Sequence, residues 1–170
     1  MRTLNMKRML IFALALVCLM LASCGSKGVY VSDLASNQVA DSMVAAIGTA
    51  EDYMSGDTDL YEFYFGGQDA YAKVEDCKML FSRLETDVNE IGVFRASSEQ
   101  DVEAVRAMVQ TYLNDQTANL RSFAANYSPA DMAKIDNAGI EVYGVYVVYY
   151  ILDAEDEVAA LDAVKQLLTK

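Results

Sequence analysis

The residues best suited to a defined chemical reaction lie near the N-terminus. There, small residues directly precede a cysteine in the segment Leu21-Ala22-Ser23-Cys24. A basic segment (residues 2–8) precedes an uncharged apolar run (residues 9–21). The run is shorter than the ~20 residues of a membrane-spanning helix, and it matches the ~7–15 residues of the apolar region of an export signal. Small residues after such a run mark a cleavage site. The pattern predicts an exported chain with a thiol at its processing site.

This segment resembles the signal peptide of bacterial lipoproteins, whose lipobox motif ends in the modified cysteine. The resemblance implies that residues 1–23 are removed and that Cys24 becomes an acylated N-terminus with a diacylglycerol thioether. Each buried CH2 contributes about 0.8 kcal/mol, so more than one acyl chain makes the anchor stable. We therefore expect a protein anchored to the cell membrane on its extracytoplasmic face, with no cofactor besides this covalent lipid. The alternative is a conventional secretory signal followed by a chance cysteine.

Other groups that support catalysis are scarce. The sequence contains no histidine, which removes Ser-His and Cys-His catalysis and the commonest transition-metal ligand. Cys18 lies within the signal and Cys24 is assigned to lipid, so Cys77 remains alone and no intramolecular disulfide is possible. Glu75 and Asp76 precede Cys77, and negative charge disfavours a reactive thiolate. We expect Cys77 to be a small, buried packing residue.

The acidic residues form local clusters at Asp57–Asp59 and Asp153–Glu157. Catalysis by a carboxylate pair needs two different environments that separate the pKa values, and neither cluster has apolar surroundings. A calcium-binding EF-hand loop needs glycine at its sixth position and glutamate at its twelfth, and loops that start at Asp57 or Asp153 have neither. We predict helix capping and solvation for these residues, with no catalytic residue and no metal site.

Four tyrosines are the candidates for a binding surface. Tyr61 and Tyr64 lie in one aromatic segment, and Tyr146 and Tyr150 lie in another. On an extended strand, Tyr146 and Tyr150 point to the face opposite Tyr149. One face must be core, and the other is a candidate for an exposed aromatic surface, because tyrosine is enriched at binding hot spots. A sheet face covered by a helix is the alternative.

The charge balance excludes one class of partner. Residues 1–23 contain three of the 13 basic residues and none of the 25 acidic ones, so their removal changes the formal net charge from −12 to −15. Such a chain repels phosphate backbones and anionic membrane surfaces. We expect no nucleic-acid partner and a domain that stands off its anchor on a short tether, residues 24–30. Residues 31–170 have the length of one domain.

Hydrophobic periodicity predicts the elements that position these residues. Apolar residues at helical spacing indicate a helix that is capped by Ser32 or Asp33 and ends near Ile47, followed by a polar loop over 51–57. The other expected elements are a short helix (59–65), strands (77–83 and 89–96), a long helix from Ser97 or Ser98 to about 125, a helical turn at Ser128-Pro129, a hairpin (139–152) with its turn near Gly144, and a final helix from Asp153 to Leu168.

The order of these elements predicts an α+β fold in a single domain. Two β-hairpins form an antiparallel sheet, the long helix joins them, and the N- and C-terminal helices pack on the sheet, with the helices on one face. An exported domain without a disulfide must depend on its apolar core for stability.

Two segments carry a family resemblance. The first, Asn89-Glu90-Ile91-Gly92-Val93-Phe94-Arg95-Ala96, places an acidic residue and an aliphatic-aromatic strand before a charged helix. The second, Asn137-Ala138-Gly139-Ile140-Glu141-Val142-Tyr143-Gly144-Val145-Tyr146-Val147-Val148, places a strand and a glycine before Tyr-Val-Val. Both are similar to the DUF4358 lipoproteins of Firmicutes, a family of unknown function. The resemblance covers about residues 30–168 and implies a lipid anchor, a single domain and the outer face of a single plasma membrane, but no activity or catalytic residue.

Three functions are compatible with these residues. The leading hypothesis is a lipid-anchored, non-catalytic envelope lipoprotein that binds an envelope protein partner or a ligand, in an oligomeric state that the residues do not specify. The first alternative is a small carboxylate-dependent hydrolase or carbohydrate-active enzyme, which needs two carboxylates ~5–9.5 Å apart with one of them buried. The second is a ligand-capture lipoprotein, which needs a deep apolar pocket.

Overall fold

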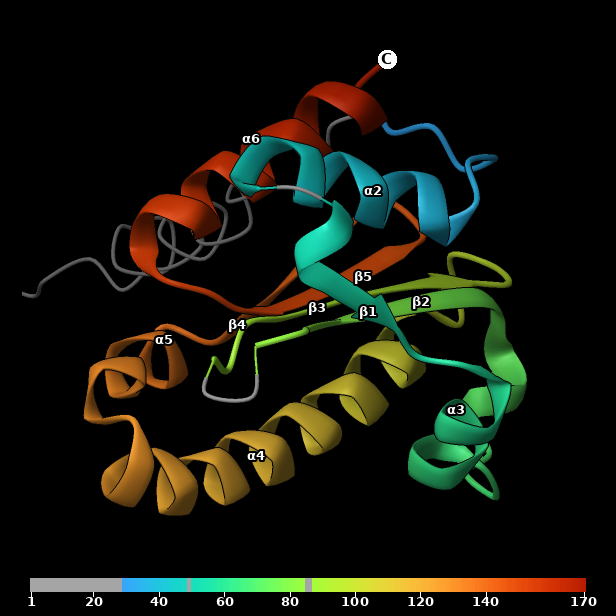
Figure 1. Ribbon diagram of the computed structural model, residues 1–170. Helices are drawn as coiled ribbons and strands as arrows, with labels where there is room; N and C mark the ends of the chain where they lie inside the picture. Colours follow the sequence, from blue (N-terminus) through green and yellow to red (C-terminus); the bar gives the residue numbers. More distant parts are fainter. Residues whose placement is uncertain (1–28, 49, 85–86) are drawn as a thin grey trace, which may run out of the picture.

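The structure, a computed structural model, describes residues 29–48, 50–84 and 87–170. A five-stranded antiparallel sheet has the strand order β1-β2-β3-β5-β4 (Figure 1). The strands are β1 (Tyr53–Ser55), β2 (Val74–Ser82), β3 (Glu90–Ala96), β4 (Gly139–Tyr143) and β5 (Tyr146–Ile151). The α-helices are α2 (Ser36–Ile47), α3 (Thr58–Phe65), α4 (Val102–Tyr127), α5 (Met132–Asp136) and α6 (Ala154–Leu168), and the 3-10 turns are η1 (Ala50–Asp52), η2 (Tyr71–Lys73) and η3 (Pro129–Asp131). The predicted α+β class and single domain are confirmed.

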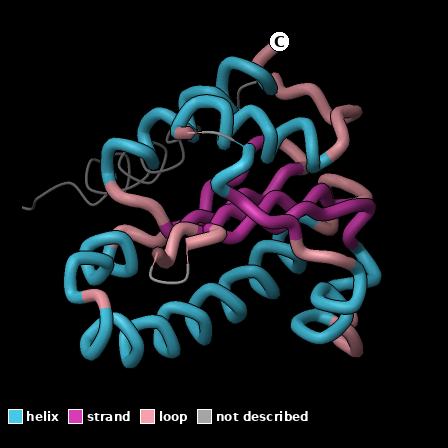
Figure 2. Tube along the Cα trace, viewed as in Figure 1, coloured by secondary structure: helices cyan, strands magenta, loops and turns pink. Residues whose placement is uncertain are grey.

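Helices cover both faces of the sheet, so the prediction that they lie on one face is wrong. Figures 1 and 2 show α2 and α6 together on one side, with α4 and α5 on the other side and α3 beside them. The reason lies in strand β5, which pairs on both edges and is buried at every position. A strand that is apolar on both faces needs cover on both faces.

Two apolar cores therefore lie on opposite sides of the sheet. Val93 and Tyr150 belong to the core under α2 and α6. Phe94 and Tyr149 belong to the core under α4. Neighbouring residues of one strand thus enter different cores, as the alternation of side chains along a strand requires.

The two predicted hairpins form, and α4 joins them as expected. The first hairpin pairs β2 with β3, the second pairs β4 with β5, and β3 pairs with β5 at the centre of the sheet. Gly144 begins the two-residue turn of the second hairpin with φ of +61°. A glycine in this position and conformation is typical of a type II′ hairpin turn.

Strand β1 is an element that the sequence pattern does not predict. Its three residues lie within the expected polar loop 51–57, and they pair with β2 in the register Tyr53↔Ser82. Tyr53 is buried. A strand this short shows no period-2 alternation that a pattern search can detect. Its conformation depends on pairing with β2, which lies about 25 residues later in the chain.

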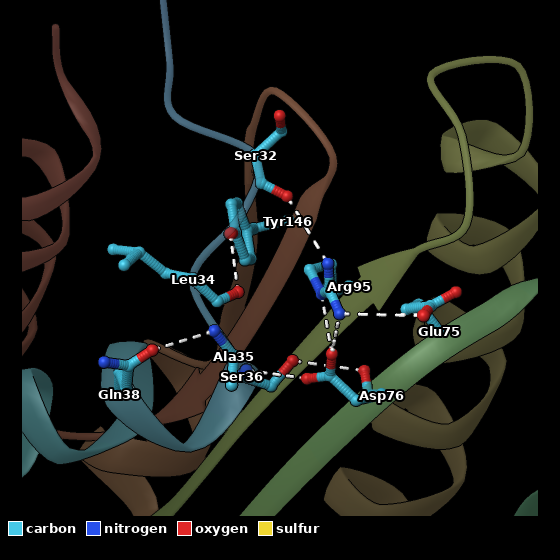
Figure 3. A network of polar contacts seen from close by, with 9 residues as sticks. All are labelled: Ser32, Leu34, Ala35, Ser36, Gln38, Glu75, Asp76, Arg95 and Tyr146. Carbon is cyan, nitrogen blue, oxygen red and sulfur yellow. Dashed lines mark hydrogen bonds and ion pairs between the residues drawn. The ribbon is translucent and has the colours of Figure 1, made fainter.

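The start of α2 differs from the prediction, because neither Ser32 nor Asp33 caps it. The helix begins at Ser36, and the carboxylate of Asp76 in β2 accepts a hydrogen bond from the Ser36 amide at 2.6 Å (Figure 3). Arg95 Nε donates to the other carboxylate oxygen, also at 2.6 Å. Burial would raise the pKa of the Asp76 carboxyl, but the bonds from Ser36 and Arg95 outweigh burial and hold it below its usual range. An acceptor from a distant strand thus takes the place expected for Ser32 or Asp33, while Gln38 Oε1 accepts the Ala35 amide at 3.0 Å.

Other helix starts agree with the sequence. The Asp153 carboxylate accepts two first-turn amides of α6 at 3.0 Å, and Asp57 accepts one of α3 at 2.9 Å. The capping role predicted for the acidic clusters is therefore confirmed at these two residues. Helix α4 begins at Val102, later than expected, and the Ser98 hydroxyl bonds the Asp101 side chain at 2.5 Å just before it.

Candidate functional site

An acidic side chain is buried at the start of β3. Glu90 is 2% exposed, on the face of the sheet that α4 covers. Its Oε1 accepts hydrogen bonds from the hydroxyls of Tyr112 at 2.5 Å and Tyr149 at 2.6 Å. Its Oε2 accepts from Gln116 Nε2 at 3.0 Å. Three donors thus hold this carboxyl group in the core, where an unpaired charge costs several kcal/mol.

The protonation of this cluster follows from its surroundings. Burial raises the pKa of the Glu90 carboxyl, and the bonds from Tyr112, Tyr149 and Gln116 oppose the shift. Burial also raises the pKa of Tyr112 and of Tyr149, and the nearby Glu90 charge adds to both shifts. The two tyrosines therefore stay protonated at neutral pH and remain available as donors.

The position of Tyr149 depends on a glycine in the neighbouring strand. Gly92 of β3 is the register partner of Tyr149. The ring lies over this glycine so closely that a Cβ on Gly92 would be 1.8 Å from Tyr149 Cε1. The free space lets the hydroxyl reach Glu90, two residues earlier in β3. Gly139 gives similar room to Tyr150 on the other face, where a Cβ would be 2.5 Å from its hydroxyl.

A surface hollow of about 210 Å³ lies beside the Glu90 cluster, between α3 and α4. Tyr64 of α3 and Gln68, which follows α3, line one side. The other side consists of residues at spacings of three and four, which share one face of α4: Thr111, Tyr112, Asp115, Gln116 and Asn119. The rings of Tyr64 and Tyr112 meet edge to face, with centroids 4.9 Å apart. Tyr112 and Gln116 both line the hollow and bond Glu90, so the buried carboxyl group holds part of its wall.

The fold separates the tyrosines that were expected to share a surface. Tyr64 is half-buried and lines the hollow. Tyr61 is also half-buried, but its hydroxyl donates to the Gly56 carbonyl at 3.0 Å and accepts from the Met79 amide at 3.2 Å. Through these two bonds, Tyr61 links the segment between β1 and α3 to strand β2. It does not line the hollow.

The prediction that Tyr146 and Tyr150 belong to an exposed surface is wrong. Tyr146 is 0% exposed and Tyr150 is 5% exposed, and both lie in the core under α2 and α6. The Tyr146 hydroxyl donates to the Leu34 carbonyl at 2.7 Å (Figure 3), and the Tyr150 hydroxyl donates to Glu157 at 2.7 Å. A tyrosine can be buried wherever its hydroxyl finds an acceptor. Helices α2 and α6 cover this face of the sheet, as the alternative prediction has it.

The cysteines divide between the described and the undescribed parts of the chain. Cys24 lies outside the described residues, as do residues 1–23. Within the ranges that are described, no helix is both long and apolar enough to span a membrane. Cys77 is half-buried and free. Burial and the adjacent Asp76 charge raise the pKa of its thiol to about 12, which agrees with a packing residue rather than a nucleophile.

Sequence reasoning missed the centre of this site. The sequence pattern identifies Glu90 only as the acidic residue that precedes a strand, and its partners Tyr112 and Gln116 lie 22 and 26 residues away on α4. The only available signal was an acidic residue next to a run of strand formers. As to metals, the described residues contain no group of three or more acidic, cysteine or histidine side chains that can hold an ion.

Comparisons with known proteins identify the family. No curated protein and no solved structure matches the chain. A family model described as "Domain of unknown function (DUF4358)" matches residues 48–152, a shorter range than the resemblance suggested. The matched range contains Glu90, its three hydrogen-bond partners and Gly92. The chain therefore belongs to the DUF4358 family.

Proposed function

We propose that this protein is a lipid-anchored domain of the cell envelope that binds a partner protein in the hollow between α3 and α4. Cys24 carries the anchor, on the extracytoplasmic face of the membrane, and the folded domain carries the binding site. The anchor is supported by the lipobox-like segment that ends in Cys24. The binding role is supported by the structure around Glu90.

The observation that carries the binding role is the buried carboxyl group beside the hollow. A protein that has apolar residues of similar volume in place of a buried ionic group is often as stable, or more stable. Protein stability alone therefore gives little reason for a glutamate at position 90. Two of its partners, Tyr112 and Gln116, line the hollow. Their hydrogen bonds to Glu90 hold them in one orientation, and a wall that is already ordered loses less entropy on binding.

The path of the N-terminal segment supports the same arrangement. Tyr30 forms an isolated β-bridge with Thr169, beside the C-terminal end of α6. The chain between Cys24 and Tyr30 can span at most about 20 Å, which keeps this side of the domain near the anchor. The helices α3 and α4 lie on the other side of the sheet (Figure 1). A partner can therefore approach the hollow from the side away from the attachment point.

Replacement of the predicted anchor residue tests the first half of the proposal. We expect Cys24→Ala to abolish incorporation of an alkyne analogue of palmitate into the full-length protein in cells, because the thioether cannot form. Ser26→Ala, two residues beyond Cys24, is the matched control and is expected to label like the wild type. A wild-type protein that takes up no label would contradict the anchor.

Site-specific photocrosslinking tests the second half. With benzoylphenylalanine in place of Asn119, in the wall of the hollow, we expect one reproducible adduct with an envelope protein in cells. The adduct should disappear when Tyr64→Ala is added. The same crosslinker at Asp41, which is exposed on α2 over the opposite face of the sheet, is the control. Equal adducts at both positions, or none at position 119, would count against this binding role.

A carboxylate-dependent hydrolase remains as the alternative, and one observation favours it. The buried Glu90, with its raised pKa, and the exposed Asp115 are carboxyl groups in different environments near one hollow. Both oxygens of Glu90 already accept hydrogen bonds, so a substrate would first have to displace Tyr112 or Gln116. Hydrolysis of a chromogenic glycoside that is lost in Glu90→Gln would favour this function. Ligand capture has less support, because the hollow is smaller than the ~300–1,000 Å³ of a typical small-molecule site.

A further inference from the structure

The hollow presents hydrogen-bond acceptors, because bonds within the protein occupy several of its donors. Gln68 Nε2 donates to the Tyr64 carbonyl at 3.0 Å, and Gln116 Nε2 donates to the Glu90 carboxylate at 3.0 Å. The Tyr64 carbonyl can only accept, so its bond determines which end of the Gln68 amide is nitrogen, and the ionised Glu90 carboxylate does the same for Gln116. Neither side-chain oxygen accepts a hydrogen bond from a described residue, so both remain available. The Thr111 hydroxyl, which donates to the Ala107 carbonyl at 3.1 Å, also keeps its acceptor capacity.

The hollow is also negatively charged. Asp115 is exposed in its wall and forms no ion pair with any residue that the structure describes. The carboxyl group of Glu90 lies behind Tyr112 and Gln116. The described lining contains no lysine and no arginine. A positively charged group is therefore attracted to this site, whereas an anion is repelled.

Aromatic rings complete the lining. Tyr64 and Tyr112 meet edge to face at 4.9 Å, and both rings lie at the wall of the hollow. The face of a tyrosine ring attracts a cation within ~6 Å of its centre. The negative charge, the free acceptors and the tyrosine rings of the hollow thus all favour a positively charged group that donates hydrogen bonds.

From these observations we propose that the hollow binds a primary ammonium group. An alkylammonium carries three N–H donors and no acceptor, which suits the side-chain oxygens of Gln68, Gln116 and Asp115. Two sources present this group, a lysine side chain of a protein and a free organic amine. The inference rests on the binding role proposed above and adds the chemistry of the group that is bound. A divalent cation fits less well, because Asp115 is the one exposed carboxylate in the described lining.

The test is a titration of the full-length, lipidated protein in micelles of a nonionic polyoxyethylene detergent. The readout is the set of side-chain amide NMR signals of Gln68, Gln116 and Asn119. Nα-acetyl-lysine methylamide represents the protein source, and n-butylammonium represents the free amine. The Nε-trimethyl derivative of the lysine probe keeps the charge without N–H donors, and the Nε-acetyl derivative removes the charge. Maltotriose represents a neutral ligand rich in hydroxyl groups.

We expect both ammonium probes to shift these signals in a saturable manner, with the trimethyl probe at least about fivefold weaker and the acetyl probe weaker still. A lysine probe that binds more tightly than n-butylammonium identifies a protein source, and equal binding identifies the ammonium group alone as sufficient. Equal binding of the trimethyl probe, or shifts with maltotriose only, would overturn the proposal.

Two matched variants locate the binding. Asp115→Asn should weaken binding of the lysine probe about fivefold, because it removes the exposed carboxylate at a surface position. Asp41→Asn makes the same charge change on α2 and should alter it less than twofold. Equal losses in both variants would show attraction to the acidic protein as a whole and would contradict a site. If the ammonium probes fail while the adduct at position 119 forms, the inference fails and the proposed function stands.

Discussion

Replacing Gly92 with alanine is expected to lower the free energy of unfolding by about 4 kcal/mol, the largest effect that we predict for a single methyl group in this protein. The new Cβ would lie 1.8 Å from Tyr149 Cε1, and Tyr149 is fully buried, so the ring has no free direction in which to move. Overpacking of a core costs about 1–3 kcal/mol. Displacement of the ring also removes the hydrogen bond from Tyr149 to Glu90, which contributes about 1.5–3 kcal/mol.

Urea unfolding followed by far-UV circular dichroism measures this loss. Gly48→Ala is the matched control, because no described atom that a Cβ on Gly48 would approach lies closer than 3.7 Å, and we expect a change below about 0.5 kcal/mol. Combining Gly92→Ala with Tyr149→Leu should cost less than the sum of the two single variants, since the leucine lacks the clashing ring atoms. Additive costs would show that the clash with Tyr149 is not the cause.

Glu90→Ala is expected to lower the free energy of unfolding by about 3 kcal/mol. The truncation leaves a cavity under α4 and removes the acceptor of two buried hydroxyls, those of Tyr112 and Tyr149. Gln116 loses its partner as well, although it lies nearer the surface. The control is Glu141→Ala, which removes an exposed glutamate from the edge strand β4 and should cost less than about 0.5 kcal/mol. Equal losses in the two variants would contradict a stabilising role of these hydrogen bonds.

The isosteric variant Glu90→Gln isolates the charge through its pH dependence. The pKa of Glu90 is higher in the folded chain than its ordinary value of 4.5, so the folded state holds the proton more tightly than the unfolded state. As pH rises from about 4.5 through the folded pKa, the wild type should lose stability relative to Glu90→Gln. The loss is about 1.4 kcal/mol for each pH unit between the two pKa values, and it is constant above the folded pKa. If the wild type instead gains stability relative to Glu90→Gln as pH rises over this range, the folded state favours the ionised form of Glu90 and the prediction is wrong.

Local features of the fold could be predicted from the sequence because their causes lie within a few residues. The Asp153 carboxylate meets amides two and three positions later, and Gly144 supplies the positive φ of its own turn. In α6, the apolar residues recur within one or two helical turns. In β5, the strand-forming residues follow one another directly, so this signal is local as well. Where an element depends on a distant partner, as β1 depends on β2 and the start of α2 depends on Asp76, the local pattern gave the wrong answer.

The candidate site was largely beyond sequence reasoning. Of the four tyrosines considered for a surface, only Tyr64 lies at the hollow. Tyr146 and Tyr150 are buried because backbone and side-chain acceptors, the Leu34 carbonyl and Glu157, are available inside the fold. Tyrosine is compatible with either setting, so residue type alone does not separate a binding surface from a core.

The amino-acid sequence was sufficient to predict the α+β class, the two hairpins, the long connecting helix and the acidic helix caps, because each depends on residue type and on spacing along the chain. It also identified the family through the strand segments around Glu90 and Gly144. Long-range packing, by contrast, places helices on both faces of the sheet and encloses Glu90 with Tyr112, Gln116 and Tyr149. These contacts join residues 22 to 59 positions apart, and such pairs are selected by packing and by the need of a buried polar group for partners.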